Sequence, residues 1–313
     1  MKFDFQSVVS GCLLIFFSLF LPISNAGAAP KTIIWSKTPF PPGYIMEGEE
    51  VGRGYGDLLN NFMKKYLPQY RHKTNAYPNW ERLIKEMVDG PLICNSVFFY
   101  RPPEQRKEIK EQFVLSAPSA VFFLHDVIVL KSEAHRFGEE VSFSTLLRNQ
   151  KLTFGYSRPY GTTYNKMLGE YLGMTTDFEV DTVGRLTALQ KRKNIHARVS
   201  SNNMIGGMLK MLTKKRVDWI LEYDFMIKFE ARRLGIIDLV TAIPVKETRN
   251  EVPKLAYVCS DTPEGRKAIA AINRVLKERR STEEYKRTLE YIVPENRKQE
   301  YWSHYEKILT QYE

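Results

Sequence analysis

The feature that most constrains the fold is an order of short apolar runs and amphipathic stretches that occurs twice along the chain. The first occurrence extends from the β-branched segment Thr32–Trp35 to the apolar segment Leu92–Phe99. The second extends from Leu152–Tyr156 to Val217–Leu221. Both have the order strand, helix, strand, helix, strand, which is typical of a parallel sheet with helical crossovers. We therefore predict an α/β protein with two lobes.

Capping and spacing signals define the elements between these strands. The first lobe should have a helix from Gly56, a strand over His72–Tyr77 and a helix that Asn79 caps. The spacing of apolar residues in this second helix predicts a buried face of Trp80, Leu83, Ile84 and Met87. For the second lobe we expect a helix after Thr163, a strand over Asp177–Val180 and a helix over Met204–Leu212.

The C-terminal part has a different pattern. Lys254–Cys259 is a lone strand, and Thr262 with Pro263 begins a helix. Ser281 and Glu284 have the spacing of a capping box for the last helices. These elements need a sheet to pack on, so we expect the tail to return to the first lobe.

The length and composition agree with two ordinary domains. The chain has 313 residues, of which 43% are hydrophobic and 26% are charged, so it can bury a core. Three cysteines are too few for a disulfide-dense scaffold or a four-cysteine zinc site.

Residues 1–28 have the pattern of an export signal. Lys2 precedes the apolar run Val8–Leu21, and small residues at 26–28 offer a cleavage site. An uncleaved anchor is the alternative, although the run is short for a membrane span, which needs about 20 apolar residues. A later apolar stretch, Ser119–Leu130, is interrupted by His125 and Asp126. We therefore expect a mature protein outside the cytoplasm, where Cys94 and Cys259 either pair or remain separate buried thiols.

Signals of enzymes and metal sites are weak. The five histidines form no HExxH motif and no pair with ligand spacing. Gly155-Tyr156-Ser157 resembles the start of a nucleophile elbow, but Pro159 stands where that motif has glycine. We expect no catalytic residues, no metal and no cofactor.

Two loops have the chemistry of an anion site. Gly161 with Thr162 and Thr163 opens a helix, where free N–H groups, hydroxyls and the helix dipole favour a carboxylate; an ordinary threonine N-cap is the alternative. Arg101 and Arg106 lie in a proline-stiffened loop after a strand, the place where open α/β sheets bind ligands. A solvated basic loop is the alternative there.

Two aromatic side chains and two basic runs also bear on partners. Trp35, at the end of the first strand, and Phe40 either line the same crevice or, for Trp35, belong to the core. The runs 191–193 and 214–216 account for part of the net charge of +10. Such runs contact nucleic acid or anionic lipid, or are simply solvated. Export argues against nucleic acid, and we expect solvated faces.

Taken in order, several segments resemble the bacterial extracellular solute-binding proteins of family 3, the polar amino-acid-binding type, and within it a divergent branch. The resemblance covers nearly the whole mature chain and depends on the order and spacing of these segments: Asn79–Arg82, Gly90, Cys94, Arg101–Arg106, Phe113–Pro118, Phe154–Gly161, Arg216–Asp218 and Gly265–Asn273.

The resemblance implies a type II periplasmic-binding-protein fold, in which two α/β lobes are joined by a two-strand hinge and close on a ligand. Lobe 1 would then comprise residues 29–124 and 246–313, and lobe 2 residues 125–245. Arg106 would grip a ligand carboxylate, and Gly161 and Thr162, with Thr163, would add hydrogen bonds. Arg158 and Tyr160 lie in the same second-lobe turn and complete that set.

The chain departs from the family where α-amino acids are recognised. Members that bind them have an acid five residues after the aspartate that matches Asp218, and this chain has Tyr223, flanked by Glu222 and Asp224. Arg101 or Pro102 also replaces a serine or threonine of the family. These changes put an amino-acid ligand in question and suit a more anionic one.

The resemblance also bears on the cysteines and on function. It places the strand of Cys259 beside that of Cys94, which favours a disulfide. It implies a monomeric periplasmic protein, without enzymatic activity or a nucleic-acid partner, that binds a small anionic or zwitterionic, amino-acid-like solute. The solute would pass to an inner-membrane permease for ABC-type uptake, or its binding would be reported to a sensor. An enzyme on the same scaffold and a ligand-free cell-envelope interaction protein are the alternatives.

Overall fold

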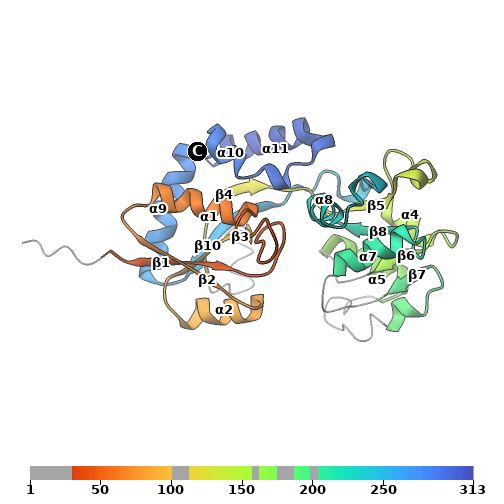
Figure 1. Cartoon of the computed structure of the whole chain (residues 1–313), viewed down its shortest axis with the longest axis horizontal. Helices are drawn as coiled ribbons and strands as arrows, with labels where there is room; N and C mark the ends of the chain where they lie inside the picture. The colour runs from red at the N-terminus through yellow and green to blue at the C-terminus, as the bar shows by residue number, and fades with distance from the viewer. Residues whose placement is uncertain (1–29, 101–112, 157–161, 175–186, 198–203, 313) are drawn as a thin grey trace, which may run out of the picture. The chain divides into compact units, whose positions relative to one another are not determined.

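Two sheets with helices packed on them form the described part of the chain (Figure 1). Each sheet has five strands. The computed structural model describes residues 30–100, 113–156, 162–174, 187–197 and 204–312. Within it, residues 31–313 form one compact unit. The predicted α/β class with two lobes is confirmed.

The first sheet has the strand order β2-β1-β3-β10-β4. Its strands are β1 (Thr32–Lys37), β2 (Arg71–Ala76), β3 (Ile93–Phe99), β4 (Phe113–Val121) and β10 (Lys254–Ser260). The strands β1, β2 and β3 are parallel, whereas β10 is antiparallel to both of its neighbours. The helices of this lobe are α1 (Tyr55–Tyr66), α2 (Trp80–Asp89), α9 (Pro263–Arg279), α10 (Glu283–Arg287) and α11 (Lys298–Gln311).

The second sheet has the order β7-β6-β8-β5-β9. Its strands are β5 (Asp126–Leu130), β6 (Phe154–Tyr156), β7 (Ile195–Ala197), β8 (Trp219–Glu222) and β9 (Val240–Ile243). Its helices are α4 (Phe143–Arg148), α5 (Thr162–Leu172), α7 (Met204–Thr213) and α8 (Asp224–Arg233). Short 3₁₀ helices are η1 (Lys131–Arg136), η2 (Ile237–Leu239), η3 (Lys246–Thr248), η4 (Glu290–Ile292) and η5 (Glu295–Arg297). The strand β6 is parallel to β7 and β8, and β5 is antiparallel to β8 and β9.

The chain passes between the two sheets twice, through residues 122–125 and 244–253, which we call the hinge. The Phe122 N–H donates to the Pro253 carbonyl at 3.1 Å, so the two segments are bonded to each other. After the second passage the chain enters β10 and then the C-terminal helices. Residues of α9, α10 and α11 pack in the core cluster of the first lobe, so the tail returns to this lobe as expected of elements that need a sheet to pack on.

The central strands of the first sheet are also joined covalently. Cys94 of β3 and Cys259 of β10 lie directly opposite each other, and their sulfur atoms are 2.03 Å apart in a disulfide. This is the pairing that the family resemblance implies. The disulfide spans 165 residues of sequence, which include the whole second sheet.

Three local predictions need correction or fall outside the structure. Ile84 is 41% exposed, because the sheet and its neighbours cover only the Leu83 and Met87 side of α2. Thr282, not Ser281, caps α10, and the Glu284 carboxylate instead accepts hydrogen bonds from Lys65 and Tyr66 of α1. The segment Asp177–Val180 lies outside the described residues, and the described strand between α5 and α7 is β7, at 195–197.

Candidate functional site

The carboxyl ends of the parallel strands in the second sheet gather several polar and aromatic side chains. The strand β6 leads toward α5, β8 leads directly into α8, and the first residue of β5 pairs with the last of β8 (Asp126 with Glu222). Ligands of open α/β sheets bind at this edge. We call it the ligand edge.

His125, at the hinge, is the centre of this edge. Its side chain is 3% exposed, and its ring stacks on Tyr223 with 3.8 Å between ring centroids. Tyr164 of α5 packs edge-on against the same imidazole at 5.5 Å and donates its hydroxyl to the His125 carbonyl at 2.7 Å. Burial raises the pKa of Tyr164, so its hydroxyl remains a proton donor. The contacts fix α5, the hinge and the end of β8 against one another.

Glu222 is turned into the protein. Glu222 is 2% exposed, and its carboxylate accepts a hydrogen bond from the Tyr223 N–H at 2.9 Å. The Nε2 atom of His125 lies 4.0 Å from the same carboxylate. Tyr223 itself is half-buried and also stacks on Phe225 at 5.3 Å. The edge therefore presents the ring of Tyr223, while the Glu222 carboxylate bonds within the protein.

Thr163, in the first turn of α5, already contacts an anion of the protein. Its Oγ1 atom lies 3.1 Å from each oxygen of the Glu251 carboxylate, which comes from the hinge segment 244–253. Helix N-termini stabilise such a negative charge. The hydroxyl thus has the orientation and surroundings to bind a carboxylate.

The predicted residues of the first lobe are placed differently. Trp35 is completely buried, donates its Nε1–H to His72 Nδ1 at 3.1 Å and packs edge-on against Tyr257, so it belongs to the core and does not line a crevice. Phe40 is half-buried and pairs with Tyr44 in a tight turn. A row of rings continues toward the ligand edge, in which Phe99 lies 5.4 Å from Phe122, and Phe122 lies 5.9 Å from Tyr223.

Five predicted site residues lie outside the described residues: Arg101, Arg106, Arg158, Tyr160 and Gly161. Thr162 is the first residue of α5, next to Thr163. Of the predicted set, the structure brings Glu222 and Tyr223 to the ligand edge, and it places Thr163 beside Tyr164 on the helix that packs there.

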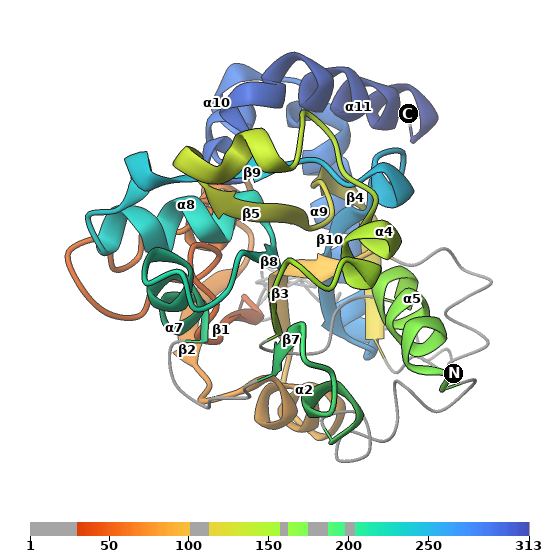
Figure 2. The same ribbon diagram turned by 90° about the vertical axis from the view of Figure 1, so that its right-hand side faces the viewer.

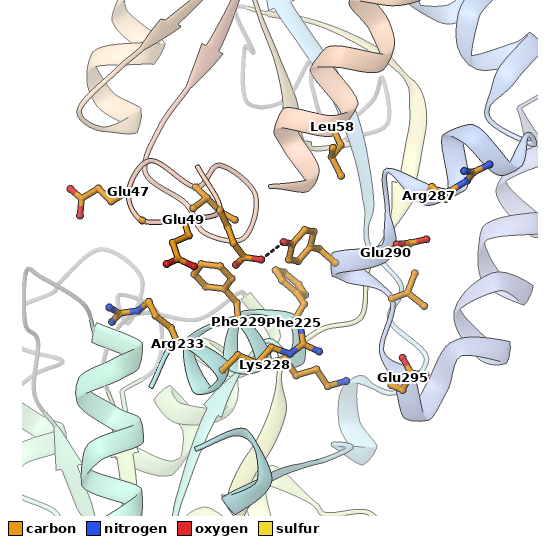
Figure 3. Close-up of a pocket in the computed structure, with 16 residues that line it drawn as sticks. Glu47, Glu49, Leu58, Phe225, Lys228, Phe229, Arg233, Arg287, Glu290 and Glu295 are labelled. Carbon is orange, nitrogen blue, oxygen red and sulfur yellow. Dashed lines mark hydrogen bonds between the residues drawn. The ribbon is translucent and has the colours of Figure 1, made fainter. Parts of the chain in front are cut away.

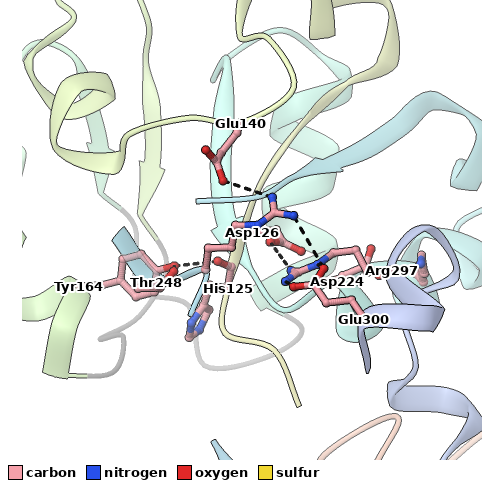
Figure 4. A network of polar contacts seen from close by, with 10 residues as sticks. His125, Asp126, Glu140, Tyr164, Asp224, Thr248, Arg297 and Glu300 are labelled. Atoms are coloured by element: carbon pink, nitrogen blue, oxygen red, sulfur yellow. Dashed lines mark hydrogen bonds and ion pairs between the residues drawn. The ribbon is translucent and has the colours of Figure 1, made fainter. Parts of the chain in front are cut away.

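A network of charged side chains ties the C-terminal segment to this region (Figure 4). Arg297 of η5 lies 3.8 Å from Asp126 of β5, and both side chains are only 8% exposed. The same guanidinium donates to Glu300 of α11 at 2.8 and 2.9 Å and lies over the ring of Phe123. Arg249 of the hinge joins Glu300 at 3.8 Å to Glu140 at 3.2 Å.

Asp126 is the titratable group of this network with the most unusual environment. Burial raises the pKa of Asp126 to about 7, and the nearby Asp224 carboxylate adds to the increase, while Arg297 and Lys228 oppose it. Lys228 also pairs with Asp224 within α8. Asp126 is therefore expected to change between its neutral and charged forms near neutral pH.

A separate cavity of about 890 Å³ has strongly charged walls (Figure 3). One wall is the acidic segment Glu47–Glu50, another is the basic face of α8 with Lys228, Arg232 and Arg233, and Phe225 and Phe229 lie between them. Glu50 accepts from the Tyr291 hydroxyl at 3.0 Å and Arg233 pairs with Glu230. The cavity is large enough for a small molecule, but none of the sequence-predicted site residues lines it.

Metal and membrane signals are absent from the part of the chain that the structure describes. There, no group of three or more histidine, cysteine, aspartate or glutamate side chains is arranged to hold a metal ion. Among the same residues, no helix has the length and apolar character needed to cross a bilayer.

Sequence reasoning missed His125, Tyr164 and Asp126 as residues of this region. His125 and Asp126 did give a signal, since they interrupt the otherwise apolar stretch Ser119–Leu130. A polar pair inside such a run is costly unless it has partners, and here the partners come from three distant segments. Tyr164 gave no signal, because an amphipathic helix position predicts burial and not a hydrogen-bond partner.

No family model matches the chain, and no curated protein is similar to it in sequence. Solved structures do match. The ancestral cationic amino-acid solute-binding protein AncCDT-1 superposes with a TM-score of 0.56 at 14% identity, over 83% of this chain and 95% of that one. A protein solved in work on glutathione import via GshT and the cystine ABC importer TcyBC of Streptococcus mutans gives 0.54 at 11%, over 84% and 95%. The ligand-binding core of GluR0 with L-glutamate gives 0.52 at 12%, over 84% and 100%.

These identities establish the fold alone. The chain has the type II periplasmic-binding-protein fold, as the sequence resemblance implies, with two mixed five-stranded α/β sheets. Its sequence is divergent from the solved structures of that fold.

Proposed function

We propose that the chain is a periplasmic solute-binding protein that captures a small anionic or zwitterionic, amino-acid-like solute between its lobes for ABC-type uptake or for sensing. The observation that carries the proposal is the ligand edge. There His125, Tyr164 and Tyr223 come together beside a hinge of two hydrogen-bonded segments. Ligand binding between two lobes requires a site at such a junction.

The anionic part of the ligand is inferred from Thr163. Its hydroxyl, in the first turn of α5, bonds the Glu251 carboxylate, so a ligand carboxylate would meet a suitable donor after displacing Glu251. Arg106 would supply a positive charge and hold the ligand carboxylate through two parallel hydrogen bonds. Arg101, Arg158, Tyr160, Gly161 and Thr162 complete the proposed set.

The rest of the ligand would contact aromatic side chains and not a free carboxylate of the protein. Glu222 already bonds to the backbone and faces His125, while Tyr223 keeps part of its surface exposed. This arrangement supports a solute whose charge is mainly negative, with a body that packs on Tyr223.

The proposal also includes the organisation of the chain. Residues 1–28 would be removed on export, residues 29–124 and 246–313 would form lobe 1, and residues 125–245 lobe 2. Expression with the native N-terminus, followed by cell fractionation and N-terminal sequencing, checks this. We expect a periplasmic protein that begins near Ala29, and an intact N-terminus in the membrane fraction would contradict it.

A thermal-shift screen of amino acids, dicarboxylates and short peptides tests the function. We expect one class to raise the melting temperature in proportion to the logarithm of its concentration above Kd, without being chemically altered. Conversion of the ligand, followed by NMR, would instead favour the alternative of an enzyme on the same scaffold.

Variants test the site once a ligand from this screen is found. Arg106→Ala should abolish its thermal shift, Thr163→Val should reduce it, and Glu251→Gln should increase it because a competing carboxylate is removed. Arg232→Ala, in the charged cavity, is the matched control and should leave the shift unchanged. A full shift in Arg106→Ala would refute the assigned site, and a loss only in Arg232→Ala would assign the ligand to the cavity.

A further inference from the structure

The opposite edge of the second sheet, where its parallel strands begin, is built from turns that bond directly to one another. The Phe154 N–H donates to the Asn194 carbonyl at 2.8 Å, which joins the turns before β6 and β7. The Asp218 N–H donates to the Thr153 carbonyl at 2.8 Å, and the Thr153 N–H donates back to the Asp218 carboxylate at 2.7 Å. The turns before β6, β7 and β8 are therefore neighbours in space.

Two further segments reach the same edge because β5 is antiparallel to β8. Leu130, the last residue of β5, pairs with Val240, the first of β9. The 3₁₀ helix η1 directly follows Leu130, and the 3₁₀ helix η2 directly precedes Val240. Figure 2 is turned so that the second sheet lies toward the viewer. We call the five segments 131–136, 148–153, 191–194, 214–218 and 236–239 the basic edge.

Charge on the basic edge is strongly one-sided. It has three acids, Glu133, Asp218 and Asp238, against ten exposed cations, so it accounts for most of the net charge of the chain. The cations are Lys131, Arg136, Arg148, Lys151, Lys191, Arg192, Lys193, Lys214, Lys215 and Arg216. Among carboxylates of the described residues, only Glu133 and Asp218 pair with any of them, and they engage only Arg136 and Lys215. The other eight are exposed and have no carboxylate partner among the described residues, and one of them, Arg192, lies over the Tyr171 ring.

An exposed apolar side chain accompanies these cations. Leu239 of η2 is 52% exposed, one of few large apolar side chains of the described residues that face solvent to this extent. It is next to Val240, whose partner Leu130 directly precedes Lys131. A leucine that projects beside a row of Lys and Arg is suited to the boundary between lipid headgroups and acyl chains.

We propose that the basic edge docks the protein on the surface of a bilayer that contains anionic phospholipids. Its ten cations come from five separate segments on an exterior edge, and none of them lines the charged cavity beside α8, which fits an extended surface of charge and not a single small anion. Each Lys or Arg near such a surface strengthens binding by about fivefold at moderate salt, and the attraction falls as salt rises. The edge lies at the strand ends opposite to the ligand edge, so docking leaves the proposed ligand site free.

Co-sedimentation with vesicles tests the docking. The probes are vesicles of phosphatidylcholine alone and of equimolar phosphatidylcholine and phosphatidylglycerol, at low and at high salt. We expect the protein to sediment only with the anionic vesicles and to be released by salt. Equal partition to both vesicles, or to neither, overturns the proposal, and binding to soluble polyglutamate without vesicle binding assigns the edge to an acidic polymer instead.

Charge-reversal variants locate the docking surface. The triple variant Lys191→Glu, Lys193→Glu, Lys214→Glu should bind anionic vesicles at least tenfold more weakly. The control Lys31→Glu, Lys85→Glu, Lys267→Glu has the same net charge but changes exposed cations of the first lobe, and it should bind as the unmodified protein does. Equal weakening in both overturns the assignment to this edge. Unchanged melting temperatures and an unchanged ligand shift separate this outcome from misfolding and from failure of the proposed function.

Discussion

The two sheets have the same number of strands but are held together by different means. In the first sheet, the Cys94–Cys259 disulfide joins two central strands whose residues are far apart in sequence. In the second sheet, Phe154 and Trp219 of neighbouring strands stack with 4.1 Å between centroids, and Phe143 packs edge-on against both rings. The first sheet thus has a covalent link in addition to edge-on ring contacts such as that of Trp35 with Tyr257, whereas the second has closely stacked rings at its centre.

Chain topology explains the difference. The strands β5 to β9 come from one continuous stretch, so the second sheet assembles from neighbouring segments and packing suffices. The strand β10 reaches the first sheet only after the whole second sheet has been traversed, and its pairing with β3 closes a long loop. A cross-link at that pairing removes part of the loop-closure entropy of the unfolded chain.

The largest effect is expected from removing the aromatic centre of the second sheet. Trp219 is completely buried between Phe154 and Phe143, so Trp219→Ala leaves a cavity and should lower the free energy of unfolding by about 3–5 kcal/mol. Urea titration followed by circular dichroism measures this. Trp302→Ala, at a half-buried position on α11, should cost clearly less, and equal losses would show that the stacked rings have no special role.

Removing the disulfide should act on the other sheet. The double variant Cys94→Ala, Cys259→Ala is expected to lose about 2–5 kcal/mol, as is typical for a native disulfide. Hydrogen exchange by mass spectrometry should show faster exchange in β3 and β10 and unchanged exchange in β6 and β8. Exchange that accelerates equally in both sheets would mean that the disulfide supports the second sheet as well.

Much of the frame of both sheets follows from sequence, because strand and helix signals are local. Asn79 caps α2 through a 2.8 Å bond to the Arg82 N–H, and Thr262 with Pro263 begins α9, both as the capping rules predict. The strand β7 was not predicted, because residues 195–197 are too short for a periodicity signal. Trp35 was ambiguous, since the same aromatic suits a crevice or a core until its neighbours His72 and Tyr257 are known.

The candidate site was predictable only in part, because its contacts join segments distant in sequence. The family resemblance pointed to Glu222 and Tyr223 through their spacing from Asp218, but it gave no sign that the Glu222 carboxylate lies beside His125, almost a hundred residues earlier. The pairing of Arg297 with Asp126 joins the C-terminal tail to β5, and no local pattern marks either residue as a partner of the other.

The pH dependence of stability should distinguish Asp126, at the start of β5, from an exposed carboxylate of the same lobe. Because burial raises the pKa of Asp126 to about 7, the folded state holds this proton more tightly than the unfolded state does. Stability from this group is therefore present at acidic pH and is lost as the pH rises toward neutrality. Asp126→Asn mimics the protonated form, so it should be more stable than the unmodified protein at pH 8, and this advantage should shrink at pH 5. The urea midpoint at the two pH values measures this. Asp238→Asn, which changes an exposed carboxylate of the same lobe, should show no such gain. If Asp126→Asn and the unmodified protein differ by the same amount at both pH values, the raised pKa of Asp126 is contradicted.

The smallest effect, of opposite pH direction, is expected at Glu247 in the second hinge segment. Although burial opposes it, hydrogen bonds from Ser142, Ser144 and the Phe143 N–H hold the pKa of Glu247 below its usual value. The charged form is therefore the stabilising one, and its contribution is lost as the pH falls below the usual glutamate range. Glu247→Gln should cost about 1 kcal/mol at neutral pH and nothing in acid, because the anion caps α4 much as an N-cap residue does. Thermal unfolding at both pH values measures this, and a loss that persists in acid would mean that Glu247 acts through packing and not through its charge.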